Sequence, residues 1–158
     1  MPLIEGIDDL TRLLPLFLVR CGVAAICGGL IGIERQLKDK PAGFRTNILI
    51  CLGASIYMAV GLLLPTDAVD PTRIAAQVVT GIGFLGAGCI IQSGGHIRGL
   101  TTAATIWVVA AIGIVSGAGY PILAIIASLM VIVTLATLRR VETRFLNAGR
   151  TGTEDMDT

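Results

Sequence analysis

The stretch GIGFLGAG, residues 81–88, decides between two very different folds. Its first, third and sixth residues, Gly81, Gly83 and Gly86, have the G-x-G-x-x-G spacing of a dinucleotide-binding loop. That loop needs a strand before it, a helix after it and an acidic residue about 20 positions further on. Residues 99–138 contain no Asp or Glu. The stretch therefore does not predict nucleotide binding, and its glycines need another explanation.

The composition around this stretch excludes an ordinary soluble protein. Of the 158 residues, 54% are hydrophobic even without the 20 glycines, and 15% are charged. Soluble domains have about 45–50% apolar residues with glycine included, and about 25% charged residues. The charges are gathered in short clusters, and between them lie five apolar segments: residues 13–33, 46–64, 74–92, 100–116 and 120–138.

Each apolar segment is close to the roughly 20 residues that a helix needs to cross the hydrocarbon core of a bilayer. The segments lack the alternation of barrel strands, so we expect helices, which satisfy their own backbone hydrogen bonds in lipid. The sequence predicts an all-α integral membrane protein, a bundle of five transmembrane helices with glycine-rich packing. We divide it into an extracytoplasmic N-terminal segment (1–12), the membrane domain (13–138) and a short polar cytoplasmic tail (139–158), disordered beyond the last helix.

The distribution of basic residues predicts the orientation in the membrane. One side of the bundle would hold nine Lys and Arg residues, and the other only Arg12 and Arg73, beside several carboxylates. Because cytoplasmic loops carry the excess of Lys and Arg, we expect the N-terminus outside and the C-terminus in the cytoplasm. The acidic leader MPLIEGIDDLT lacks the basic start of a cleaved signal peptide, so the first helix is expected to stay.

Small residues are the expected means of packing, because helices in lipid associate by close backbone approach. We therefore predict that the first and third helices form the tight centre of the bundle. An alternative is that the glycines break the third helix and expose carbonyl groups to an ion. The glycines concerned are Gly28 and Gly32 in the first helix and Gly81, Gly83, Gly86 and Gly88 in the third.

One charge, Arg20, lies about two turns inside the first apolar segment. Charges at this depth usually face the bundle or extend toward the interface. Asp67 and Asp70, in the loop after the second helix, are its expected partners in a structural ion pair. A functional gate at Arg20 is the alternative.

Two similar lead-ins point to a functional face on the cytoplasmic side. KPAGFRTN precedes the second helix and GGHIRGLTT the fourth, and each places an arginine and a threonine at a helix start. The free N–H groups and positive end of a helix start favour an anion, which is either a ligand or the internal carboxylate of Glu34. The residues expected on this face are Glu34, Arg35, Arg45, Thr46, Arg98, Thr101 and Thr102.

Other kinds of site have little support. His96 is the only histidine and no Cys-x-x-Cys pair occurs, so we expect no enzymatic activity, no cofactor and no metal site. A magnesium pathway needs oxygen ligands near the midplane, but the five apolar segments contain no Asp or Glu. Basic residues exceed acidic ones by one, so nucleic acid is not an expected partner.

Three segments give the chain a close resemblance to the MgtC/SapB family of bacterial membrane proteins. They are GGLIGIERQLKDKPAGFRTNILICLGA, RIAAQVVTGIGFLGAG and GGHIRGLTTAATIWVVAAIGIVSGAGY. The matching motif positions are Glu34, Arg35, Pro41, Gly43, Arg45 and Thr46 in one loop and Arg98, Gly99, Thr101 and Thr102 in the other.

The resemblance implies a bacterial inner-membrane protein that adapts cells to low magnesium and, in pathogens, supports survival inside host cells. It also implies a regulator that binds another integral membrane protein, such as the F-type ATP synthase, which the founding member acts on. A transporter or channel for Mg²⁺ or another small ion is the alternative, and a homo-oligomer is left open. The founding member carries a soluble C-terminal domain that this sequence does not show, so functions of that domain are not carried over.

Overall fold

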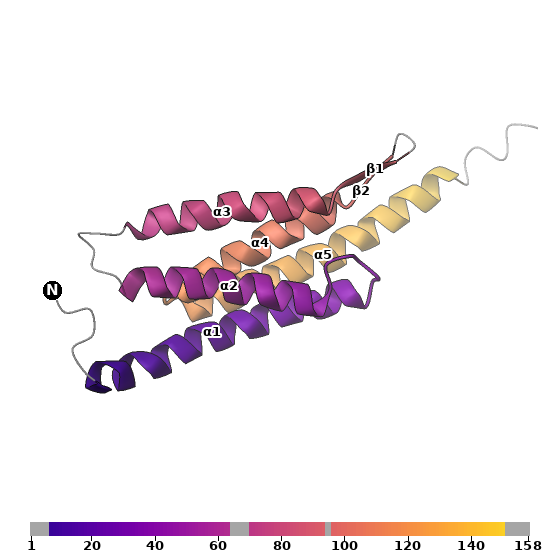
Figure 1. Cartoon of the computed structure of the whole chain (residues 1–158). Coiled ribbons are helices and arrows are strands. Elements are labelled where there is room, and N and C mark those ends of the chain that lie inside the picture. The colour runs from indigo at the N-terminus through magenta and orange to yellow at the C-terminus, as the bar shows by residue number, and fades with distance from the viewer. Residues whose placement is uncertain (1–6, 64–69, 94–95, 151–158) are drawn as a thin grey trace, which may run out of the picture.

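A computed structural model describes residues 7–63, 70–93 and 96–150 of the chain (Figure 1). Five helices and one two-stranded hairpin make up the described part. In chain order they are α1 (Ile7–Gln36), α2 (Phe44–Leu63), α3 (Pro71–Gly88), β1 (Ile91–Ser93), β2 (His96–Arg98), α4 (Leu100–Gly117) and α5 (Pro121–Arg150).

Four of the helices are long and apolar enough to cross a membrane, so the chain is a multi-pass membrane protein. These spans are Thr11–Gln36, Phe44–Leu63, Leu100–Gly117 and Pro121–Leu138. The fifth expected span, α3, exists as a helix of 18 residues but is not among the candidate spans, because Arg73, Gln77 and four glycines lower its mean hydropathy. Its membrane crossing stays a prediction.

The expected end of the third helix at residue 92 is wrong. The helix stops at Gly88, and the next residues form an antiparallel hairpin in which Gln92 pairs with Ile97. The glycine-rich end of α3 frees the backbone to leave the helix, and the β-branched residues that follow suit a strand.

The outer helices are longer than their apolar segments. α1 begins at Ile7 and α5 continues to Arg150, whereas we expected the last helix to end at residue 138. Polar residues end a membrane span without ending a helix, because helix propensity does not require an apolar side chain. The expected disordered tail is therefore helical over residues 139–150, and residues 151–158 lie outside the described part.

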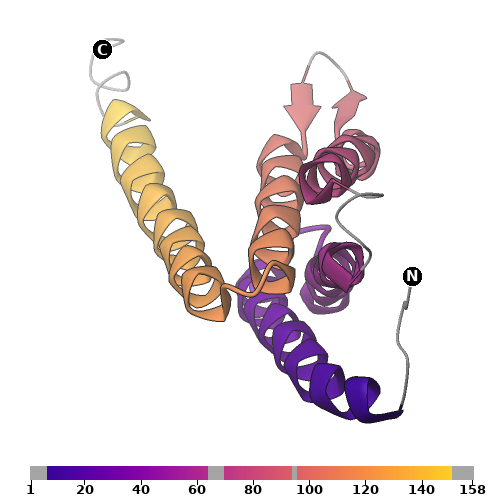
Figure 2. The same cartoon turned by 90° about the vertical axis from the view of Figure 1, so that its left-hand side faces the viewer.

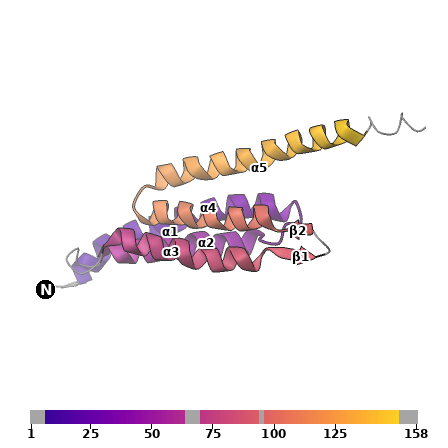
Figure 3. The same ribbon diagram turned by 90° about the horizontal axis from the view of Figure 1, so that it is seen from above.

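The centre of the bundle is formed by α1, α2 and α4, not by α1 and α3. α1 packs most extensively against α2, which packs in turn against α4. α5 covers α1 and α4 on one side, and α3 lies against α4 on the other side of the bundle (Figures 2 and 3). The buried core residues are Ala24, Cys27, Ile31, Cys51, Val109, Ile112 and Ala124.

Glycines allow this central packing, but only some of the expected ones take part. A Cβ atom at Gly28 would lie 2.6 Å from the carbonyl oxygen of Asn47, and one at Gly32 would lie 2.7 Å from the Cα of Phe44. Gly113 and Gly117 of α4 come even closer to the backbone of α2, at the carbonyl oxygens of Cys51 and Ser55. Side chains at these positions would force the helices apart.

The glycines of α3 lie mostly in open space. A Cβ atom at Gly81, Gly83 or Gly88 would have no neighbouring atom within 4 Å, and one at Gly86 would make an ordinary 3.6 Å contact with Ala103. The expectation of a close-packed glycine face on α3 is therefore wrong for the single chain, because α3 occupies the edge of the bundle.

Arg20 binds the end of α4 and not a carboxylate. Its Nη1 donates a hydrogen bond of 3.0 Å to the Gly117 carbonyl oxygen, and the Ser116 hydroxyl donates to the Arg20 carbonyl oxygen at 2.7 Å. No ion pair with Asp70 occurs in the described part of the chain, and Asp67 lies outside it. The negative end of the α4 dipole takes the place of the expected partner.

Candidate functional site

The motif residues of the two lead-ins come to one end of the bundle. Figure 1 shows the turn after α1, the hairpin β1–β2 and the far half of α5 together at this end. A cavity of about 870 Å³ lies here, between the end of α1, the start of α4 and α5. We call it the charged cavity; its lining includes five expected site residues, Glu34, Arg35, Arg98, Thr101 and Thr102.

Two expected site residues do not line the charged cavity. Arg45 and Thr46 lie in the first turn of α2, and both side chains are exposed. Lys38, Asp39 and Lys40, which follow α1 and were not expected in the site, line the cavity instead. The structure therefore brings together the motifs at the end of α1 and the start of α4, and leaves the start of α2 outside.

Arg35 is the most deeply buried charge of the cavity, with 3% of the residue exposed. Its Nη2 donates a hydrogen bond of 3.0 Å to the Thr102 hydroxyl, which joins α1 to the first turns of α4. Its Nε is buried and has no hydrogen-bond partner among the described residues. A buried donor without a partner is costly, so this side chain is suited to a ligand that accepts a hydrogen bond.

Glu34 pairs with Lys38, one turn later on α1, and not with Arg45 or Arg98 as the internal pairing predicted. The ion pair uses Oε1 of the carboxylate. Oε2 is buried and has no partner among the described residues. Two residues that line the cavity thus each carry a buried atom without a partner, a donor on Arg35 and an acceptor on Glu34.

The start of α4 is open. Its N-cap is Gly99, in the left-handed conformation with φ 91°, and no side chain caps the helix. Only glycine fits there without strain, and a Cβ atom would also collide with the Cys89 carbonyl oxygen. The first backbone N–H groups of α4 thus keep their donors available beside the charged cavity.

The start of α2 is closed by the chain itself. The Gln36 side-chain oxygen accepts a hydrogen bond of 3.1 Å from the Phe44 backbone N–H. The buried Asn47 amide donates to the carbonyl oxygens of Ala42 and Gly43, at 2.9 and 2.8 Å. Gln36 and Asn47 were not among the expected site residues. The Asn47 amide donates to carbonyl oxygens, whereas the N-cap pattern that a sequence reveals is an Asn before the helix whose oxygen accepts from its first N–H groups.

The charge of the cavity favours an anion. Four basic and two acidic side chains line it, an excess of two positive charges. The open helix start adds partial positive charge at the same place. Its remaining wall, with Leu135 and Leu138 of α5, is apolar. Nowhere in the described ranges do three His, Cys, Asp or Glu side chains gather to hold a metal ion.

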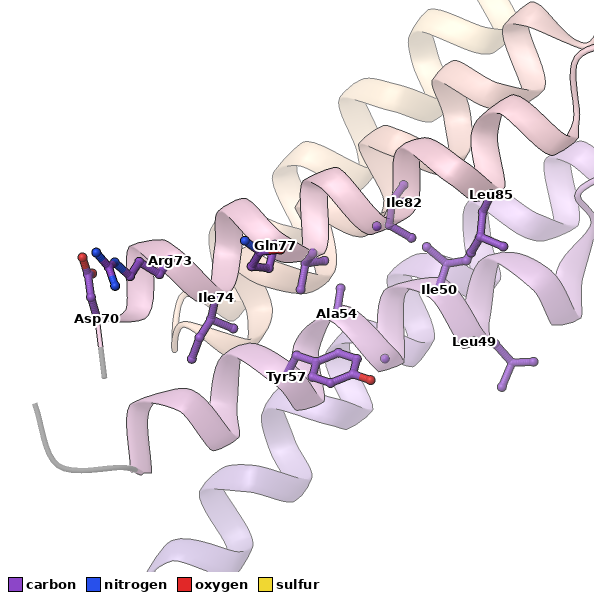
Figure 4. Close-up of a pocket in the computed structure, with 13 residues that line it drawn as sticks. Leu49, Ile50, Ala54, Tyr57, Asp70, Arg73, Ile74, Gln77, Ile82 and Leu85 are labelled. Atoms are coloured by element: carbon purple, nitrogen blue, oxygen red, sulfur yellow. The ribbon is translucent and has the colours of Figure 1, made fainter. Parts of the chain in front are cut away.

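A larger cavity of about 1000 Å³, the lateral groove, lies between α2 and α3 (Figure 4). Its walls are largely hydrocarbon, with Asp70 and Arg73 at one end. Asp70 is already engaged there, because its side chain accepts hydrogen bonds from the backbone N–H and hydroxyl of Thr72, which lower its pKa. The charged cavity is smaller than the lateral groove, but more charged and polar groups line it, so it is the better candidate for a binding site.

Four apolar helices and a charged cavity at one end define a multi-pass helical membrane protein with a polar site at its boundary. The sequence model that describes the MgtC family matches residues 21–144, and the chain belongs to this family. No solved structure matches.

Three relatives show the extent of the similarity. "Putative magnesium transporter YhiD" of Escherichia coli K12 is 46% identical over 138 residues, which is 83% of this chain and 64% of the relative. "Protein MgtC" of Brucella abortus strain 2308 is 48% identical over 116 residues, 73% of this chain and 48% of the relative. "Protein MgtC" of Salmonella typhimurium strain 14028s is 43% identical over 121 residues, which is 77% of this chain and 52% of the relative. The chain thus spans about half to two thirds of the length of these relatives.

Proposed function

We propose that this chain is a non-catalytic protein of the bacterial inner membrane that adapts the cell to low magnesium by regulating another integral membrane protein. The F-type ATP synthase is the partner that the family resemblance favours. The charged cavity and its rim form the contact. The single observation that carries this proposal is the gathering of Glu34, Arg35, Arg98 and Thr102 around one cavity at the end of the bundle.

The orientation belongs to the same proposal. The cavity faces the cytoplasm, the N-terminus lies outside, and α3 completes a bundle of five spans. The excess of Lys and Arg at this end of the bundle supports that orientation. It puts the contact surface where soluble parts of a membrane partner are accessible.

Growth in low magnesium tests the proposal. A strain that lacks the gene is complemented with the parent, with Arg98→Gln or with Arg45→Gln, and the protein in the membrane is quantified by immunoblot. Arg98 lines the cavity, whereas Arg45 is an exposed arginine outside it, so it is the matched control. We expect Arg98→Gln to reach the parent level in the membrane and to lose the growth, with Arg45→Gln unaffected. Full growth with Arg98→Gln at full level contradicts the proposal.

Crosslinking in cells tests for the partner. A photoreactive amino acid replaces Leu138, on the cavity wall, or Leu14, an exposed residue at the opposite end of the bundle. We expect an adduct that contains a membrane subunit of the F-type ATP synthase from the Leu138 position only. The same adducts from both positions, or none from Leu138, contradict this partner.

A transporter of Mg²⁺ is the second candidate, favoured by the printed name of the Escherichia coli relative. The carboxylates Glu34, Asp39 and Asp70 stand at helix ends or in a turn, which supports the regulator more than a path through the bundle. Purified protein in liposomes that contain a magnesium-sensitive dye separates the two. If the protein is a regulator, magnesium should enter these liposomes no faster than it enters liposomes without protein. Faster magnesium entry favours the transporter.

A further inference from the structure

Two residues that line the charged cavity each carry a buried polar atom that the protein does not satisfy. Arg35 Nε is a donor and Glu34 Oε2 is an acceptor, both are buried, and neither has a partner among the described residues. Each unmet group costs free energy in a folded protein. An anion that only accepts hydrogen bonds would satisfy the first and repel the second. The pair therefore selects a ligand that both accepts and donates.

The other groups of the cavity select the accepting part of this ligand. The uncapped first turn of α4 presents backbone N–H donors and the positive end of a helix. Arg98 and Lys40 add positive charge, while Lys38 is already paired with Glu34. Several donors around one position suit an oxyanion with more than one negatively charged oxygen.

The unused oxygen of Glu34 selects the donating part. A carboxylate accepts hydrogen bonds and repels a fully deprotonated oxyanion. Sulfate and phosphodiesters have no proton on their acidic oxygens at neutral pH. Inorganic phosphate keeps an O–H group there, and a phosphate monoester keeps one in part, because its second pKa is about 6. The carboxylate thus distinguishes anions of similar size and shape.

We propose that the charged cavity binds a phosphate group that retains a proton, with Arg35 and the first turn of α4 donating to its oxygens and Glu34 accepting from its hydroxyl. Two sources supply this chemistry, free inorganic phosphate and a membrane lipid whose headgroup is a phosphate monoester. This inference rests on the proposed function in using the same cavity, and it adds a ligand through which the contact with a partner is regulated.

The test measures equilibrium binding of labelled inorganic phosphate to the purified full chain at neutral pH, with sulfate as competitor. We expect phosphate to bind and sulfate to compete at least about tenfold more weakly, the effect of one repelled or lost hydrogen bond to a charged group. Absence of phosphate binding, or equal competition by sulfate, overturns the inference for free phosphate.

Glu34→Gln tests the discrimination without removing a basic residue. The amide can donate to sulfate, so we expect sulfate and phosphate to compete within about threefold of each other, less than half of a tenfold step in free energy. Arg35→Gln should abolish binding, and Arg45→Gln, outside the cavity, should bind as the parent does. Parent-like discrimination in Glu34→Gln overturns the inference even if Arg35→Gln fails to fold.

Lipid arms identify the source. The chain is placed in nanodiscs that contain either phosphatidic acid, a phosphate monoester, or phosphatidylglycerol, a phosphodiester. Loss of phosphate binding with phosphatidic acid alone supports the lipid as the occupant, and retained phosphate binding in both supports free phosphate. If phosphate does not bind in either nanodisc and phosphatidic acid does not bind more tightly than phosphatidylglycerol, the inference is wrong. No partner protein is present in this experiment. A negative result therefore contradicts the ligand only, and the growth test still decides the proposed function separately.

Discussion

The starts of α2 and α4 follow similar lead-ins but are finished in opposite ways. At α2 the chain caps itself: Gln36 accepts from Phe44, and Asn47 holds the preceding carbonyl oxygens. At α4 no side chain caps the helix, and Arg35 from α1 lies beside it with an unused donor. The difference teaches that a sequence pattern locates a helix start, whereas residues from other elements decide whether that start is closed or free to bind.

The largest expected effect comes from filling the glycine at the start of α4. Gly99→Ala places a side chain on a left-handed backbone and against the Cys89 carbonyl oxygen. The strained conformation costs about 1–3 kcal/mol, and the overpacking adds a similar amount. Thermal unfolding of the purified protein should show the loss.

Gly43→Ala, before α2, is the matched control for Gly99→Ala. Its Cβ would lie 3.1 Å from the Gln36 side-chain oxygen, which is flexible and can shift. We expect a clearly smaller loss of stability. Equal losses in the two variants would contradict the different construction of the two starts.

The next effect concerns the packing of α1 on the start of α2. Gly32→Ala brings a Cβ to 2.7 Å from the Cα of Phe44, and overpacking of this kind costs about 1–3 kcal/mol. Gly83→Ala makes the same change in α3, where the Cβ meets no atom within 4 Å. We expect unfolding at a lower temperature for Gly32→Ala alone. A large loss with Gly83→Ala would restore α3 as a close-packed helix.

A smaller effect follows from removing the Asn47 side chain at the start of α2. Asn47→Ala removes the buried amide that donates to the Ala42 carbonyl oxygen, at a cost of about 1–2 kcal/mol, whereas the Gly43 oxygen keeps the backbone N–H of residue 47 as its donor. Phosphate binding at the charged cavity should be unchanged, since Asn47 does not line it. Lost binding at parent stability would show that the two starts act as one site.

The smallest effect is expected at Arg45. Its side chain is exposed at the start of α2, so Arg45→Gln should change the free energy of unfolding by no more than about 0.5 kcal/mol. A denaturation curve in detergent checks this value. A larger loss would reveal a contact of Arg45 that the single chain lacks.

The sequence predicts the membrane helices well because composition alone determines which segments enter lipid. The four spans overlap the expected apolar segments, and the turn after α1 and the hairpin β1–β2 lie at the same end of the bundle (Figure 1). Hydropathy does not reveal where a helix gives way to a hairpin or continues beyond its apolar segment. The expected ends of α3 and α5 were therefore wrong. Hydropathy also does not show which helices pack against each other. Gly113 and Gly117 have the same four-residue spacing as Gly28 and Gly32, and this pattern could have identified α4 as a central helix.

The site was predictable in part for the same reason. The motifs gave Glu34, Arg35, Arg98, Thr101 and Thr102, which do line one cavity. The exclusion of Arg45 and the orphaned atoms of the cavity depend on packing between α1, α4 and α5. Such contacts join residues far apart in the sequence, and they cannot be inferred from a single sequence.

Protection by phosphate tests most directly whether the start of α4 is the open one. Thr101→Cys and Thr46→Cys, made separately in a variant whose four native cysteines are replaced by alanine, place one thiol at each helix start. The rate of labelling by an anionic thiol reagent is measured with and without inorganic phosphate. We predict that phosphate slows labelling of Thr101→Cys and leaves Thr46→Cys unchanged. Equal rates with and without phosphate at both positions, or equal slowing at both, would contradict the account.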